Sequence, residues 1–95
     1  MTTEHVLKTT DVYWDAIESG QKNFEVRRDD RGFQKGDLLT LVRVEWREHG
    51  SGGRRLVETT FDGRARVLHR EITYVLTGGQ LGIEPGYVVM GLRKA

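Results

Sequence analysis

The sequence predicts a small domain of the α+β class, mainly β, in which five or six strands close into a barrel and one early helix covers an opening of that barrel. Apolar residues recur at helical spacing in one early segment, whereas they alternate with polar residues through much of the remaining chain. The chain has 95 residues, which is enough for one hydrophobic core and too few for two. We therefore expect residues 1–95 to form a single domain.

The first elements are expected to be a short strand over residues 4–9 and a helix over residues 12–19. Thr10 offers a side-chain oxygen to the N-terminus of this helix, and Asp11 places a carboxylate in its first turn, where backbone N–H groups lack partners. Gly20 follows the apolar stripe and suits the left-handed conformation that ends many helices.

The rest of the chain is predicted to form strands separated by turns. In residues 38–47 apolar and charged side chains alternate with a period of two, which indicates a strand with one buried face. The same pattern or a short apolar run predicts strands at residues 23–28, 38–47, 56–61, 66–76 and 87–92. Residues 48–55 contain three glycines and are expected to be a flexible loop, and residues 77–86 contain four glycines and the single proline of the chain.

Composition excludes several classes of protein. The chain has no cysteine, which rules out a disulfide framework, a thiolate zinc site and a cysteine nucleophile. It has no apolar run long enough to span a membrane and no apolar signal-peptide core, so we expect a soluble, cytoplasmic protein without membrane contact. The histidines lie in separate segments without zinc-like spacing, and no glycine-rich loop follows the dinucleotide or P-loop pattern. We expect neither a metal nor a cofactor.

Basic and acidic residues nearly balance, but arginine dominates the basic set. Fifteen Lys and Arg oppose fourteen Asp and Glu, for a net charge of +1, so no strong overall field attracts polyanions. Arginine outnumbers lysine by 11 to 4, and guanidinium suits bidentate contacts to phosphate or carboxylate. The alternative is a solvated surface on which these arginines pair with Glu58, Asp62 and Glu71.

Three polar residues lie together where the helix passes into the next strand. Lys22 precedes the strand, and Glu25 and Arg27 share one of its faces, opposite the apolar pair Phe24 and Val26. An ammonium, a carboxylate and a guanidinium can therefore converge at the barrel mouth and hold a polar ligand, with Glu25 accepting from an amine or amide. The alternative is a cross-strand network of ion pairs without a ligand.

Aromatic residues could stack on a single-stranded or flipped base. The candidates are Tyr13, Trp14, Trp46 and Tyr87. Trp46 and Tyr87 lie in apolar strand contexts and also fit a core, which is the interpretation we favour for Trp46. Trp14 lies off the apolar stripe of the helix, so we expect it to be partly exposed near the cleft.

Several motifs of this chain resemble a known family. The pattern Gly-x-Lys-x-x-Glu-x-Arg begins at Gly20, and Arg-x-Phe-x-x-Gly-Asp begins at Arg31. Together with residues 70–76 (REITYVL) and 84–90 (EPGYVVM), they resemble the ASCH domain of the PUA-like superfamily. More narrowly, they resemble the DUF3850 group of bacterial and phage proteins. The resemblance covers nearly the whole chain except residues 48–55.

This resemblance implies a PUA-like β-barrel with a cleft beside the helix, in a superfamily associated with RNA and modified nucleotides. One branch of ASCH proteins deacylates N4-acetylcytidine with a Lys, a Thr nucleophile three residues later and a distant Glu, and some longer members are credited with ribonuclease activity. Lys22 matches the first of these residues, but Glu25 stands where that branch has its Thr. A carboxylate does not replace a lysine-activated hydroxyl nucleophile. Glu71 is a loose match for the distant Glu.

We expect an RNA- or nucleotide-binding module. In this hypothesis Lys22 and Glu25 read a base edge, and Arg27, Arg28 and Arg31 contact phosphate. The alternative is a small hydrolase acting on a modified nucleoside or on single-stranded RNA, with Lys22 and Glu25 as catalytic groups. A further alternative, an accessory protein that binds another protein, has no positive feature in the sequence.

Overall fold

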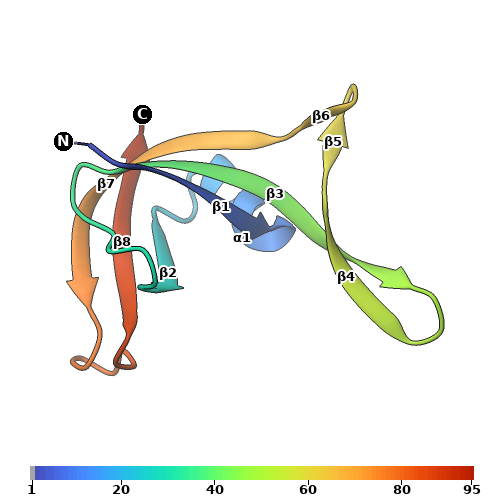
Figure 1. Ribbon diagram of the computed structural model, residues 1–95. Helices are drawn as coiled ribbons and strands as arrows, with labels where there is room; N and C mark the ends of the chain where they lie inside the picture. Colours follow the sequence, from blue (N-terminus) through green and yellow to red (C-terminus); the bar gives the residue numbers. More distant parts are fainter. Residues whose placement is uncertain (1) are drawn as a thin grey trace.

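The computed structural model describes residues 2–95, in which one helix and eight strands occur (Figure 1). The elements are β1 (Glu4–Thr10), α1 (Asp11–Glu18), β2 (Phe24–Arg28), β3 (Leu38–His49), β4 (Gly53–Glu58), β5 (Thr60–Phe61), β6 (Arg64–Ala65), β7 (Val67–Thr77) and β8 (Tyr87–Lys94). The mainly β composition and the single early helix confirm the coarse fold prediction.

Six of the strands form one open sheet. Its order is β1-β3-β7-β8-β2, with β4 paired to β3 beside this path, and a separate hairpin consists of β5 and β6. The β1–β3 pair is parallel and the other pairs are antiparallel. The expected closed barrel is wrong, because β1 and β2 stand at the two ends of the order with no ladder between them in residues 2–95.

Arginine side chains cross the gap between these two end strands. Arg27 Nη2 donates to the Lys8 carbonyl at 2.7 Å, and Arg31 Nη1 donates to the Val6 carbonyl at 2.9 Å. Carbonyls of β1 thus accept from guanidinium groups, where a closed barrel would supply backbone N–H groups. We call this gap, spanned by Arg27 and Arg31, the seam.

The core lies where α1 packs against the sheet. Its buried members come from most of the longer elements: Leu7, Trp14, Ile17, Phe33, Leu39, Leu41, Ile72, Val88, Met90 and Leu92. Trp14 Nε1 donates to the Leu41 carbonyl at 2.9 Å, which satisfies the one polar atom of the indole. The expectation that Trp14 is partly exposed is wrong, since only 2% of its surface is accessible.

The helix begins one residue earlier than predicted and ends where Gly20 was expected to end it. Thr10 occupies the N-cap position in extended conformation, but its hydroxyl makes no capping hydrogen bond. Gly20 has a φ of 84°, which a residue with a Cβ adopts only with strain, and its N–H donates to the Ile17 carbonyl at 3.1 Å. The Lys22 N–H donates to the Ala16 carbonyl at 3.0 Å, so the helix end fixes the backbone of Lys22.

A buried carboxylate ties the loop before β3 to the start of β1. Asp37 Oδ2 lies 2.9 Å from His5 Nε2 and accepts from the backbone N–H of Gln34, and Oδ1 accepts from the N–H of Thr3. Burial alone would raise the pKa of Asp37, but the hydrogen bonds from His5 and the two N–H groups lower it below its ordinary value.

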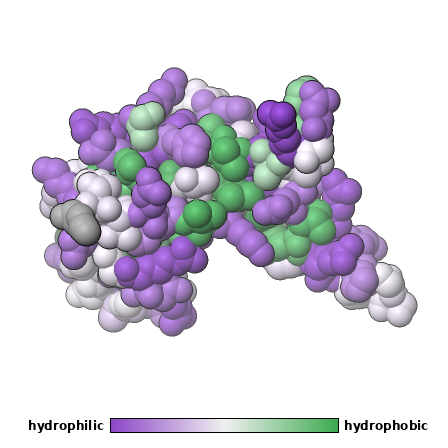
Figure 2. Space-filling view, turned by 45° about the horizontal axis from the view of Figure 1, so that its top comes forward, coloured by the Kyte–Doolittle hydropathy of each residue, from purple (hydrophilic) through white to green (hydrophobic). Residues whose placement is uncertain are grey.

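A long hairpin projects from the body of the molecule (Figures 1 and 2). It consists of the paired ends of β3 and β4, residues 44–58, and we call it the arm. Much of the segment expected to be a flexible loop, residues 48–55, belongs to its strands, and the turn occupies only residues 50–52. Trp46, expected in the core, is 51% exposed because it lies on the arm beyond the cover of the helix. The Arg54 guanidinium lies 5.1 Å from its ring centroid.

The single helix among residues 2–95 is not long and apolar enough to cross a membrane. Within the same residues, no group of three or more His, Cys, Asp and Glu side chains is placed to hold a metal ion.

Candidate functional site

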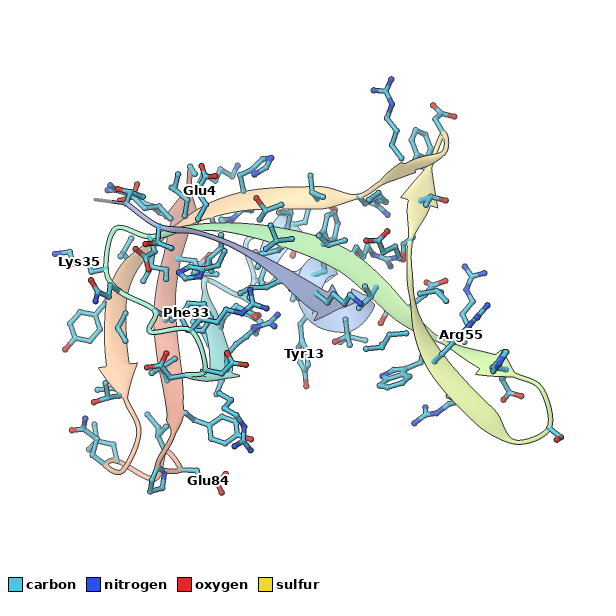
Figure 3. All side chains as sticks on the ribbon, viewed as in Figure 1. Glu4, Tyr13, Phe33, Lys35, Arg55 and Glu84 are labelled. Atoms are coloured by element: carbon cyan, nitrogen blue, oxygen red, sulfur yellow. The ribbon has the colours of Figure 1, made fainter. Side chains whose placement is uncertain are left out.

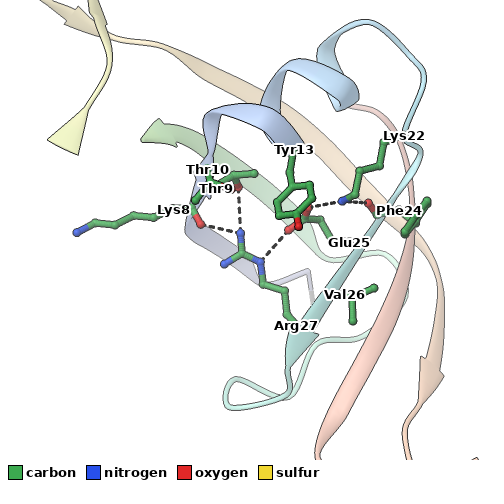
Figure 4. A pocket seen from close by; sticks show the side chains of 9 residues that line it. All are labelled: Lys8, Thr9, Thr10, Tyr13, Lys22, Phe24, Glu25, Val26 and Arg27. Carbon is green, nitrogen blue, oxygen red and sulfur yellow. Dashed lines mark hydrogen bonds and ion pairs between the residues drawn. The ribbon is translucent and has the colours of Figure 1, made fainter. Parts of the chain in front are cut away.

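A pocket of about 510 Å³ lies at the seam, between β1, α1 and β2 (Figure 4). We call it the edge pocket. Its lining residues are Lys8, Thr9, Thr10, Tyr13, Lys22, Phe24, Glu25, Val26 and Arg27. The volume falls in the range of pockets that hold small molecules, so the site can take a ligand of about the size of a nucleoside.

The polar trio predicted from the sequence converges in this pocket. Lys22 Nζ lies 2.8 Å from Glu25 Oε1, and Arg27 Nε lies 2.8 Å from Glu25 Oε2. Glu25 is only 4% exposed, and both of its oxygens accept from cations. The sequence offered a ligand cleft and an ion-pair network as alternatives. In the structure the ion pairs line the pocket, so the two features occur together.

Arg27 joins the trio to the seam. Its Nη2 atom donates to the Lys8 carbonyl at 2.7 Å and to Thr9 Oγ1 at 3.0 Å, while Nε donates to Glu25. Figure 4 shows the resulting chain of hydrogen bonds from Thr9 through Arg27 and Glu25 to Lys22. A guanidinium held at three points is pre-organised, so a ligand meets it in a fixed orientation.

Aromatic rings approach the ammonium of Lys22. Its Nζ atom lies 5.2 Å from the ring centroid of Tyr13 and 4.8 Å from that of Phe24, and it donates to the Phe24 carbonyl at 2.7 Å. Both distances allow a cation–π interaction. Tyr13 projects from α1 (Figure 3). Tyr13 is 56% exposed and Phe24 is 44% exposed. Both rings therefore offer accessible surface beside the polar trio.

The sequence profile of the family described as "Domain of unknown function (DUF3850)" matches residues 4–92. The chain belongs to the DUF3850 family. The matched region contains every residue that lines the edge pocket. No curated protein matches the chain closely enough to be a relative.

In this DUF3850 member, the polar face of β2 is more buried than its apolar face. Phe24 and Val26 share one face as predicted, but they are 44% and 52% exposed, whereas Glu25 between them is buried. The edge position of β2 explains this, because its polar face turns toward the seam and α1. Exposed apolar residues alternating with a buried carboxylate are unusual for a structural strand, and a pocket accounts for both.

The other predicted site residues lie outside the edge pocket. Arg28 stacks over the half-buried ring of Tyr87, with its guanidinium carbon 5.4 Å from the centroid, so these two residues face each other. Arg31 spans the seam through the Val6 carbonyl. Trp14 lines a separate cavity of about 520 Å³ next to β6, where Arg66 covers its ring at 4.8 Å. The expectation that Trp14 borders the same cleft as Lys22 is wrong.

Sequence reasoning missed Lys8, Thr9 and Thr10 of the edge pocket. Thr9 is 2% exposed, and its hydroxyl accepts from Arg27. The available signal was the alternation along β1, where His5, Leu7 and Thr9 share the buried parity. A hydroxyl at the end of a buried face suggests a polar partner from a neighbouring element.

The Asp15 carboxylate of α1 forms an ion pair with Arg43, which does not line the edge pocket. Arg43 donates to Asp15 Oδ1 at 2.8 Å, and this hydrogen bond lowers the pKa of Asp15 and raises the pKa of Arg43. Arg43 also donates to Thr59 Oγ1 at 2.8 Å, which fixes the start of the β5–β6 hairpin. This group holds the fold together and does not line the edge pocket.

Proposed function

We propose that this chain is an RNA- or nucleotide-binding module of the PUA-like (ASCH) type that takes one base into the edge pocket. The observation that carries the proposal is the placement of a fixed, partly accessible guanidinium and ammonium beside two exposed aromatic rings. Bases are bound in this way by stacking on aromatic side chains and by hydrogen bonds to their polar edges.

The aromatic rings supply the stacking surface. Tyr13 and Phe24 each keep about half of their surface exposed. Stacking on an aromatic side chain contributes about 1–3 kcal/mol per base and tolerates any base. The pocket is therefore suited to a single-stranded or extruded nucleotide.

Basic side chains around the pocket are placed to meet a phosphate backbone. Lys8 is exposed, and its side chain extends away from the pocket (Figure 4). Arg28 is exposed on β2, and Arg31 follows that strand. Such contacts add affinity without reading sequence, and each neutralised phosphate steepens the dependence of binding on salt.

The test is binding of a fluorescently labelled single-stranded RNA, followed by anisotropy at several salt concentrations. We expect affinity to fall steeply with salt, and we expect Tyr13→Ala to weaken binding at least about fivefold. Tyr74→Ala is the matched control, because Tyr74 is 63% exposed on β7 and does not line the pocket. Absence of binding at low salt, or equal effects of the two variants, would refute the proposal.

The resemblance to ASCH domains supports the same function through the fold. In a PUA-like barrel the seam would be the place where β1 and β2 pair, and in this chain Arg27 and Arg31 span it. The proposal predicts that the edge pocket corresponds to the cleft that the resemblance implies. An experimental structure with a bound nucleotide outside this pocket would contradict it.

A hydrolase is the second candidate, because an ammonium, a carboxylate and a hydroxyl line one pocket. Lys22, Glu25 and Thr9 are the groups concerned. Hydrolysis of an N4-acylated cytidine would break the C–N bond, transfer the acyl group to the oxygen of water and return a proton to the amine. The geometry ranks this function second, because the Thr9 hydroxyl contacts Arg27 and Glu71 pairs with Arg93 at 2.9 Å, away from the pocket.

The assay for this candidate is release of acetate from N4-acetylcytidine. Turnover that is lost in Lys22→Ala, with the circular dichroism spectrum unchanged, would establish the hydrolase. Turnover that persists in Lys22→Ala would place the activity elsewhere.

A further inference from the structure

We infer that the edge pocket selects bases that present a carbonyl, such as uracil and guanine, over bases that present an amino group at the same place, such as cytosine and adenine. This inference rests on the proposed function and specifies its ligand. It follows from which hydrogen-bonding groups of the pocket are already used and which are free.

The acceptors that Lys22 and Arg27 reach each already take part in one charge-assisted hydrogen bond. Glu25 Oε1 accepts from Lys22, and Oε2 accepts from Arg27. The carbonyls of Lys8 and Phe24 and the Thr9 hydroxyl also accept from these two cations. An amino group entering the pocket meets acceptors that already hold charge-assisted bonds, which are about twice as strong as bonds between neutral groups. In this inference the Glu25 carboxylate positions the two cations, whereas the sequence-based expectation is that it also accepts from a ligand.

The donors of the pocket are in excess. Arg27 uses Nε and Nη2, and Nη1 has no hydrogen-bond partner among residues 2–95. Lys22 has three N–H bonds and uses two of them, toward Glu25 and the Phe24 carbonyl. The charged groups left for a ligand are thus N–H donors on two cations, and their natural partner is an acceptor oxygen. The hydroxyls of Thr10 and Tyr13 also line the pocket and can either donate or accept.

A base carbonyl fits the surroundings of these donors better than a phosphate does. Two cations and one carboxylate leave the trio with a formal charge of +1, and the neighbouring surface of Tyr13, Phe24 and Val26 is aromatic or aliphatic. A planar ring covers such surface while its carbonyl oxygen reaches the donors. A phosphate would leave the aromatic rings uncovered and would place its further oxygens against apolar atoms.

Uracil O4 and guanine O6 are acceptors, whereas cytosine N4 and adenine N6 are donors at the equivalent positions. An amino group directed at Arg27 Nη1 would set a donor against a donor. A site built for one pattern rejects the other because its own polar groups are left unpaired. Discrimination of about 5- to 150-fold is typical of such a mismatch.

The decisive experiment compares monophosphates that share their phosphate and ribose. Inosine monophosphate and adenosine monophosphate differ at the 6-position in a carbonyl against an amino group, and uridine and cytidine monophosphate differ likewise at the 4-position. Binding is measured by titration calorimetry on the unmodified chain. We expect the keto member of each pair to bind at least about fivefold more tightly.

The outcomes separate this inference from the proposed function. If none of the four nucleotides binds and single-stranded RNA does not bind either, the proposed function fails. The selection by carbonyl is refuted if the two nucleotides of each pair bind with equal affinity, or if inorganic phosphate competes as well as the nucleotides do. The proposed binding of nucleotides is not refuted by either result.

A variant assigns the preference to Arg27. Arg27→Lys keeps the charge but removes the free Nη1 group, so we expect the ratio within each pair to fall toward one. Arg93→Lys is the matched control, because Arg93 forms an exposed ion pair with Glu71. A preference that survives unchanged in folded Arg27→Lys would overturn the role given to Nη1. Should that variant not fold, the comparison of nucleotides on the unmodified chain still decides the inference.

Discussion

Glu25→Gln is the substitution that tests most directly whether the polar trio stabilises the fold. The carboxylate is 4% exposed and accepts from Lys22 and Arg27, each at 2.8 Å. Glutamine has nearly the same shape, but it offers one acceptor oxygen and turns an NH2 group toward the other cation. The variant therefore keeps the packing and removes one buried, charge-assisted contact.

The expected cost follows from the burial of the partners. Removing one member of a fully buried ion pair costs about 3–5 kcal/mol. The side chains of Lys22 and Arg27 are 16% and 23% exposed, so water partly compensates them, and the remaining amide oxygen still accepts from one of them. We expect a loss of about 2–3 kcal/mol in the free energy of unfolding, which corresponds to a fall in Tm of roughly 10 °C or more.

The assay is unfolding by urea and by heat, followed by circular dichroism. Glu71→Gln is the control, because it makes the same chemical change in an ion pair of 2.9 Å whose side chains are 28% and 65% exposed. We expect the control to lose less than about 0.5 kcal/mol. Equal losses in the two variants would refute the reasoning, since burial would then add nothing to the contact of Glu25.

Three further predictions concern the fold. The lowered pKa of Asp37 means that its ionised form stabilises the fold at neutral pH, and this contribution is lost as the pH falls below the ordinary value of 3.8. The unfolding midpoint of Asp37→Asn should therefore depend less on acid than that of the unmodified chain, and equal pH profiles of the two proteins would contradict this. Trp14 is buried and Trp46 is exposed, so iodide should quench the fluorescence of Trp14→Phe much more than that of Trp46→Phe, and the reverse order would be inconsistent with the structure. Gly78→Ala would place a Cβ 2.0 Å from the Glu84 carbonyl oxygen, so urea unfolding should show a loss of about 1–3 kcal/mol, whereas a neutral effect would argue against this close approach.

Local features of the fold were predictable from the sequence because they depend on neighbouring residues. The helix and its end at Gly20 follow from the apolar spacing and from the backbone freedom of glycine. The convergence of Lys22, Glu25 and Arg27 follows from the short distance along the chain and from the alternation within β2. Neither inference required knowledge of the rest of the sheet.

Features that depend on distant elements could not be predicted in this way. Trp14 and Trp46 both lie in amphipathic segments, and the covering of Trp14 by Arg66 and the projection of Trp46 on the arm depend on where β3 leaves the core. Closure of the barrel likewise depends on whether the first and last strands of the order meet. The alternating pattern in β2 is the same whichever face is buried, so the burial of Glu25 became clear only from the position of β2 at the sheet edge.

The seam has a consequence for the behaviour of the molecule in concentrated solution. A strand at the end of a sheet presents unpaired backbone groups on which another extended chain can add. In β1 the carbonyls of Val6 and Lys8 are occupied by Arg31 and Arg27. These two guanidinium groups therefore stand in the way of a foreign strand that would dock on the carbonyls of β1.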